Sequence, residues 1–186
     1  MFYHRKLSKY KYKTSIFEEL IEFANSKNAK WKSGHDQNGL SWNVEELQLN
    51  YNDFSILHKV FGSINLEFKR PSFFLSKVLS GGLSNHIDHR KWGNLGFPLT
   101  GDFTGTKINF HDPFNQIVEI LDFNESANKI HEPFIINTRM THSVSYARPP
   151  KTERVTLMMD IFEWPGHVFE KVDNELFFSK PNKLFL

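Results

Sequence analysis

The sequence predicts a mainly β protein, in which two antiparallel sheets form a jelly roll behind a helical N-terminal layer. From Ile64 onward apolar and polar residues alternate with a period of two, which is typical of strands. Turn-forming pairs such as Gly81-Gly82 and Asp112-Pro113 interrupt this alternation at short intervals. Nineteen Phe among 186 residues supply the large flat side chains that fill the space between two packed sheets.

Two helices are expected before the strands. Ser15 begins a capping-box pattern, and apolar residues at helical spacing follow it, so the first helix should cover about 15–25. The second helix should cover about 52–61, where Asn52 or Asp53 can cap the start.

The strands follow the second helix. They are expected at 63–69, 72–79, 84–88, 94–99, 105–110, 116–122, 133–137, 141–147 and 153–162. This series of short strands is what a jelly roll requires. We expect one domain over 1–186, with the helical layer at 1–62, the β core at 63–164 and a C-terminal tail at 165–186 that packs back on the core.

Composition excludes several classes of protein. The absence of cysteine excludes disulfides, iron–sulfur clusters and thiolate zinc sites, which leaves histidine and carboxylate side chains as metal ligands. There is neither an apolar run long enough to span a membrane nor a secretory signal, so we expect a cytoplasmic protein without a membrane partner. A net charge of +2 gives no general field for nucleic acid. The basic, tyrosine-containing arm before residue 14 could bind a polyanion, but we expect its tyrosines to pack on the domain.

The most informative motif is the pair His86 and Asp88, which His142 and Arg154 follow far downstream. On a strand, residues two apart leave the same face, so His86 and Asp88 could bind one ion together. His142 would then arrive from a distant strand. Two histidines and one carboxylate leave three metal positions open, and non-haem Fe(II) oxygenases use these positions to hold a cosubstrate and O2. The motif therefore predicts an iron site.

The motif alone leaves other interpretations open. A His followed two residues later by an acid arises by chance in a chain of this composition, and His58 and Arg70 repeat the spacing of His142 and Arg154. Only His142 and Arg154 lie downstream of the pair in strand-like segments. The alternatives are a surface His-Asp pair, a core histidine at His142, a structural ion pair between Arg154 and Asp160, and His89 as the ligand in place of His86.

Further segments carry a resemblance to a known family. They are Asn94-Leu95-Gly96-Phe97-Pro98-Leu99, Phe134-Ile135-Ile136-Asn137-Thr138, His142-Ser143-Val144 and Arg154-Val155-Thr156-Leu157-Met158-Met159-Asp160. Together with the His-x-Asp pair, residues 72–164 resemble the 2-oxoglutarate/Fe(II)-dependent oxygenase superfamily. The ending at Asp160, followed by Trp164-Pro165, is similar to its aspartyl/asparaginyl β-hydroxylase-like branch. The resemblance implies a cupin-like double-stranded β-helix, Fe(II) as the cofactor, and 2-oxoglutarate and O2 as cosubstrates.

The resemblance also implies roles for single residues. His86, Asp88 and His142 would hold the iron, opposite the C1 carboxylate and keto oxygen of 2-oxoglutarate. Arg154 would bind the far carboxylate through two parallel charge-assisted bonds, and Thr156 would add a hydroxyl from the same strand face. The Asn94 amide either reaches the cosubstrate or satisfies backbone groups, and the sequence does not separate these roles.

The substrate implied by the resemblance is a small molecule or a peptide side chain. An unactivated C–H bond would be hydroxylated with release of succinate and CO2. Four residues near the expected mouth of the site either grip an anionic substrate or form a solvated rim: Arg90, Trp92, Arg139 and Arg148. The alternatives are a jelly-roll binding module without metal chemistry and a cupin-type isomerase or lyase that uses no 2-oxoglutarate. The sequence gives no oligomeric state.

Overall fold

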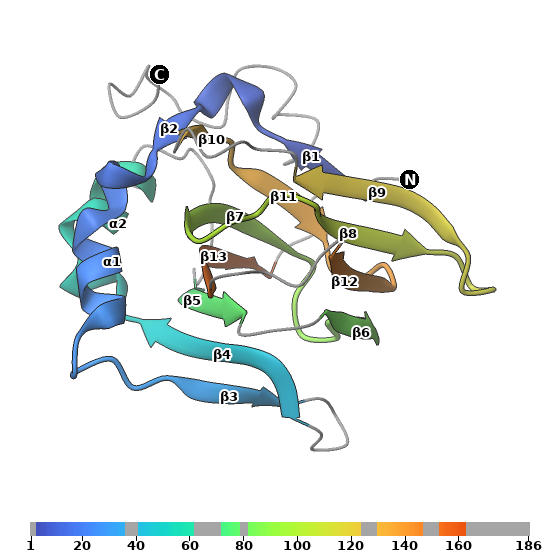
Figure 1. Ribbon diagram of the computed structural model, residues 1–186, viewed down its shortest axis with the longest axis horizontal. Coiled ribbons are helices and arrows are strands. Elements are labelled where there is room, and N and C mark those ends of the chain that lie inside the picture. The colour runs from blue at the N-terminus through green and yellow to red at the C-terminus, as the bar shows by residue number, and fades with distance from the viewer. Residues whose placement is uncertain are drawn as a thin grey trace.

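Two antiparallel sheets face each other in this protein, with two helices against the outer face of the larger sheet (Figure 1). The computed structural model describes residues 3–35, 41–61, 72–78, 82–123, 130–146 and 153–162. Within these residues the strands form a seven-stranded sheet, a four-stranded sheet and a two-stranded ribbon.

The larger sheet has the spatial order β1 (His4–Lys6), β11 (Phe134–Asn137), β7 (Gly93–Thr100), β13 (Arg154–Ile161), β5 (Ser72–Val78), β4 (Ser41–Leu49) and β3 (Lys32–His35). The smaller sheet has the order β6 (Leu83–His86), β12 (His142–Tyr146), β8 (Thr106–His111) and β9 (Ile117–Phe123). The ribbon pairs β2 (Tyr12–Lys13) with β10 (Ile130–His131). The helices are α1 (Glu18–Asn25) and α2 (Ser55–Phe61), with 3-10 turns at Ser8–Tyr10, Thr14–Phe17 and Tyr51–Asp53.

The alternating sequence of β13 explains how one strand serves two layers. Arg154, Thr156 and Met158 face the smaller sheet, whereas the residues between them face the helices. β13 pairs with β5 on one side and β7 on the other, so its backbone groups are satisfied along both edges. A central strand of this kind holds its inward side chains at fixed positions.

The core accordingly has two parts. The first lies between the helices and the larger sheet, and it contains buried residues such as Leu57 of α2, Phe97 of β7 and Leu157 of β13. The second lies between the two sheets and includes Phe110 of β8 and Phe134 of β11. Phenylalanine rings therefore fill the space between the layers, as predicted.

Both predicted helices form, but the start of each differs from the prediction. A 3-10 turn covers the beginning of the first helix, and α1 starts at Glu18. The prediction that Asn52 or Asp53 caps the second helix is wrong. Instead the carboxylate of Glu19 accepts hydrogen bonds from the backbone N–H groups of Ser55 (3.3 Å) and Ile56 (3.2 Å). The cap comes from the neighbouring helix, which satisfies the same donors.

The N-terminal region was predicted as a helical layer, and it also contributes strands. β1, β3 and β4 extend both ends of the larger sheet, and β2 forms the ribbon. Tyr12 on β2 is fully buried, and its hydroxyl donates to the carbonyl of Pro98 at 2.7 Å. The prediction that the tyrosines of the basic arm pack on the domain is therefore confirmed at Tyr12.

The predicted strands from 72 onward form within a few residues of their expected bounds. The strand predicted at 63–69 and the tail at 165–186 lie outside the described residues. Neither described helix, at 8 and 7 residues, has the length or apolar character of a membrane span.

Candidate active site

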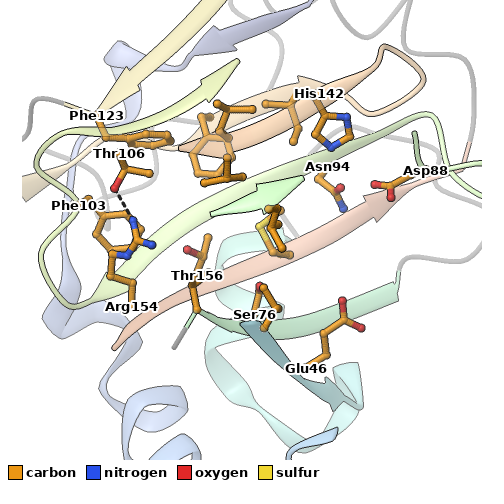
Figure 2. Close-up of a pocket in the computed structure, with 18 of the residues that line it drawn as sticks. Glu46, Ser76, Asp88, Asn94, Phe103, Thr106, Phe123, His142, Arg154 and Thr156 are labelled. Atoms are coloured by element: carbon orange, nitrogen blue, oxygen red, sulfur yellow. Dashed lines mark hydrogen bonds between the residues drawn. The ribbon is translucent and has the colours of Figure 1, made fainter. Parts of the chain in front are cut away.

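A cavity of about 160 Å³ lies between the two sheets. Inward-facing side chains of both sheets line it, and Figure 2 shows these side chains converging. Two ends can be distinguished. One end holds His142, Asp88 and Asn94 (Figure 2). The other end holds Arg154, Thr106 and Phe103, and Thr156 stands between the two ends.

His86 and His142 are brought together as predicted. They are register partners in the antiparallel pair of β6 and β12, and their ring centroids lie 4.2 Å apart. Nδ1 of His86 lies 2.7 Å from the Ser84 carbonyl, and Nδ1 of His142 lies 2.8 Å from the Met140 carbonyl. Because a carbonyl oxygen can only accept, each Nδ1 must carry the proton, and each Nε2 carries the lone pair that a metal requires.

The environment of His142 keeps its imidazole neutral. Only 4% of the residue is exposed. Burial lowers the pKa of His142 to about 4, and the nearby His86 acts in the same direction. At neutral pH the ring is therefore in the form that binds metals.

Asp88 lies on the same cavity wall, although not on the same strand as His86. The strand predicted at 84–88 ends at His86, because the Asp88 N–H turns to donate to the Thr138 carbonyl at 2.9 Å. The Asp88 carboxylate lies 3.4 Å from Nζ of Lys91. In the described part of the chain, no three His, Asp or Glu side chains converge closely enough to form a ready metal site. The donor types and the histidine tautomers fit a site of two histidines and one carboxylate. Asp88 would be that carboxylate, and Lys91 contacts it on the same cavity wall.

Lys91 and Glu46 are site residues that sequence reasoning missed. Besides Asp88, Nζ of Lys91 contacts the Asp160 carboxylate at 3.0 Å. Burial alone would lower the pKa of Lys91, but the carboxylates of Asp88, Asp160 and Glu46 outweigh it and raise the pKa. Lys91 follows Asp88 by three residues, a spacing that could have suggested an ion pair. Glu46 comes from β4, which the sequence pattern did not predict.

Arg154 dominates the other end of the cavity. Only 2% of the residue is exposed, and its guanidinium stacks on the Tyr146 ring, 3.8 Å from the centroid. Nη1 donates to the Thr106 hydroxyl (Figure 2). Nε and Nη2 have no hydrogen-bond partner in the described part of the chain. Burial lowers the pKa of Arg154, while Tyr146 and Asp102 oppose this effect. A buried guanidinium with two unused donors on one edge can bind an anion.

The remaining predicted cosubstrate residues lie between the two ends. Thr156 stands two residues after Arg154 on β13 and lines the cavity, as predicted. Asn94 also lines the cavity, and its amide donates to the Asp160 carboxylate at 2.7 Å. Asp160 therefore binds Asn94 and Lys91, and the alternative ion pair between Arg154 and Asp160 does not form.

The predicted substrate residues that the structure describes are not brought to this cavity. Arg90 is exposed, and Arg139 stacks over the Trp92 ring at 4.4 Å. None of these three lines the cavity, and Arg148 lies outside the described residues. His89, the alternative ligand, is exposed and does not line the cavity either.

No protein-family model matches the sequence, and no curated protein matches it. Several solved structures do. A prolyl hydroxylase from Trichoplax adhaerens, in complex with a hypoxia inducible factor peptide fragment, is 13% identical with a TM-score of 0.56, covering 87% of this chain and 80% of that chain. A Pseudomonas putida prolyl-4-hydroxylase is 10% identical with a TM-score of 0.53, covering 81% of this chain and 87% of that chain. A 2OG-Fe(II) oxygenase family member from Burkholderia pseudomallei is 11% identical with a TM-score of 0.50, covering 77% of each chain.

The fold is a double-stranded β-helix. At 10 to 13% identity the similarity establishes this architecture, and it confirms the predicted fold class. The chemistry of this double-stranded β-helix depends on its own cavity residues. The aspartyl/asparaginyl β-hydroxylase-like branch stays a prediction.

Proposed function

We propose that this protein is a 2-oxoglutarate- and Fe(II)-dependent oxygenase that hydroxylates an unactivated C–H bond. The observation that carries the proposal is the state of Arg154. Its guanidinium is buried at the end of the cavity opposite the histidine pair, and its Nε and Nη2 have no hydrogen-bond partner among the residues that the structure describes. These two nitrogens form the edge of a guanidinium that matches a carboxylate bidentately. A dicarboxylate that bridges Arg154 and a metal at the histidines would satisfy both ends.

His86, His142 and Asp88 are the residues that would hold Fe(II). Their donor set leaves metal positions open for a cosubstrate and O2. When bound, iron would supply the activation of O2 that couples decarboxylation of 2-oxoglutarate to oxidation of the substrate. The Nδ1 hydrogen bonds of both histidines support this assignment, because they fix the ring orientation and the tautomer.

The chain itself would bind and orient the cosubstrate and exclude water. Arg154 and Thr156 would fix the far carboxylate from one face of β13. Apolar side chains from both sheets, among them Phe134 and Met158 of the larger sheet and Ile108 of the smaller sheet, would keep water from the cavity between these groups. The substrate class proposed is a small molecule or a peptide side chain. The Trichoplax hydroxylase, which was solved with a peptide fragment, has the same fold.

The test is release of succinate. Iron-loaded protein supplied with 2-oxoglutarate under air should form succinate slowly without substrate and faster with one. Asp88→Ala and His142→Ala should lose this release, whereas His89→Ala, an exposed neighbour in the same loop, should retain it. Absence of succinate release and of 2-oxoglutarate binding at millimolar concentration in wild type would contradict the proposal.

The contact between Asp88 and Lys91 favours one other candidate, a jelly-roll module that binds a carboxylate without metal chemistry. In such a module Lys91 would keep Asp88 neutralised, and Arg154 would hold the ligand alone. Binding of 2-oxoglutarate that depends on Arg154, is unchanged by chelators and yields no succinate would support this second function.

A further inference from the structure

Glu46 is a carboxylate at the rim of the cavity without a hydrogen bond or ion pair among the described residues. It lies on β4 in register with Ser76 of β5, and Figure 2 shows its carboxylate pointing toward the end of the cavity that holds Asp88. Its neighbour Glu45 binds Lys77 at 2.5 Å and does not line the cavity. Two adjacent glutamates on one strand thus have different surroundings, and only Glu46 remains available to a ligand.

Among the described residues, Glu46 has no counter-ion of its own, because the single charge of Lys91 is shared with Asp88 and Asp160. Lys91 lies 3.0 Å from Asp160, and these two charges cancel. In the proposed reaction the charges of iron and 2-oxoglutarate are equal and opposite, and Asp88 and Arg154 contribute one charge of each sign. The negative charge of Glu46 remains. Electrostatic complementarity then favours a positive charge on the substrate.

The surroundings of Glu46 support the same conclusion. Although Glu46 is exposed overall, desolvation of its carboxylate against the cavity raises the pKa of Glu46. Lys91 opposes this effect, and Asp160 and Asp88 raise the pKa further. A carboxylate beside other carboxylates is stabilised in its charged form when a cation approaches.

The size of the cavity locates the substrate at the rim. Its volume of about 160 Å³ is close to that of a cavity of about 150 Å³ known to hold benzene, so a cosubstrate with ten non-hydrogen atoms would occupy most of the space. The buried donors of Arg154, aimed into this cavity, independently indicate that an anion fills its inner part. The substrate must then approach past Glu46, which is exposed.

We propose, on the basis of the proposed function, that Glu46 binds a cationic group of the substrate, an ammonium or a guanidinium, and holds it at the rim while a C–H bond reaches the histidine end. The substrate class is therefore an amine or a basic side chain. The sequence had suggested an anionic substrate, on the basis of arginines near the His-x-Asp pair. Arg90 and Arg139, which the structure describes, do not line the cavity.

Binding of charge-matched probes tests the inference. Wild type with Fe(II) and 2-oxoglutarate under nitrogen is titrated calorimetrically with the N-acetyl methylamides of lysine, norleucine and glutamate. We expect the lysine probe to bind about tenfold more tightly than the norleucine probe, as a charge-assisted contact provides. Free L-lysine, as a fourth probe, distinguishes a free amino acid from a side chain within a peptide.

The two adjacent glutamates provide a matched pair of variants. In Glu46→Gln the preference for the lysine probe should disappear, and in Glu46→Lys the glutamate probe should bind best. Glu45→Gln, on the same strand but away from the cavity, should keep the wild-type preference. Equal binding of the lysine and norleucine probes to wild type, binding of neither, or a preference that persists in Glu46→Gln would overturn the inference.

Succinate release separates this inference from the proposed function. If the protein prefers the lysine probe through Glu46 but forms no succinate, the cation site is supported and the oxygenase proposal is contradicted. If the protein forms succinate but binds the lysine and norleucine probes equally, the oxygenase proposal is supported and the cation site is contradicted.

Discussion

His142 of β12 pairs directly with His86 of β6, and the two imidazole centroids lie 4.2 Å apart. The antiparallel register places both side chains on the inner face of the smaller sheet. Each ring is oriented by a bond from Nδ1 to a carbonyl two residues earlier in the chain. Two distant segments therefore place two imidazole rings side by side on the wall of the cavity.

The first prediction concerns the metal. His142→Ala should abolish Fe(II) binding, because one remaining histidine and Asp88 cannot hold the ion tightly. The fold should remain, since the side chain lines a cavity and is not part of either apolar cluster. The measurement is iron retained after anaerobic desalting, together with circular dichroism. His89→Ala is the control. Stoichiometric iron in His142→Ala would show that the ligand set is wrong.

The second prediction concerns the cosubstrate. Arg154→Lys should raise the Kd for 2-oxoglutarate by about ten- to a hundredfold, because a bidentate pair becomes a single contact. Iron binding should survive, since Arg154 lies at the other end of the cavity (Figure 2). Anaerobic titration of the iron-loaded protein measures the change. Arg139→Lys, which alters a guanidinium stacked on Trp92 outside the cavity, should leave the Kd unchanged. Equal affinity in wild type and Arg154→Lys would assign the carboxylate to another residue.

The fold could be predicted from the sequence where the apolar alternation was long. β13 alternates except at Met158, and its bounds were close to the prediction. β4 was missed although Leu47 and Leu49 are both buried, because Glu46 and Gln48 on the other face are polar and exposed. The short β1 and β2 have too few residues for a pattern, and tertiary pairing alone makes them strands.

The candidate site could be predicted only in part. The order of residue types along the chain and their strand-like context selected His86, Asp88, His142 and Arg154 as candidates. The ending of β6 at His86 was not predictable, because it depends on a backbone bond from Asp88 to Thr138. The ion pair between Arg154 and Asp160 was excluded once β13 formed as one continuous strand, because six residues along a strand span about 20 Å.

The third prediction concerns Gly96 and the shape of the cavity wall. A Cβ at this position would lie 2.2 Å from the ring of Phe134, which lines the cavity from β11. Gly96→Ala should lower the free energy of unfolding by about 1–3 kcal/mol through overpacking. Adding Phe134→Leu should restore part of the loss, because the smaller side chain leaves room for the methyl group. Urea unfolding of both variants checks this, and a Gly96→Ala protein as stable as wild type would contradict it.

The fourth prediction concerns acid sensitivity at His4. Its ring stacks on Phe110 at 5.5 Å, and Nε2 lies 3.5 Å from the Glu119 carboxylate. Burial lowers the pKa of His4 below its ordinary value, and Glu119 opposes this without reversing it. The folded protein therefore binds this proton more weakly than the unfolded chain does, so the stability present above pH 6.5 is lost as the pH falls through the folded pKa.

His4→Phe keeps the stacked ring and removes the proton site. Its Tm should fall less than that of wild type between pH 7 and pH 5, by about 1–3 °C. Above pH 7.5 the histidine is neutral in both the folded and the unfolded chain, so the Tm values of the two proteins should run parallel there. Differential scanning calorimetry across this range provides the comparison. If the two Tm curves stayed parallel down to pH 5, protonation of His4 would have no part in the acid sensitivity.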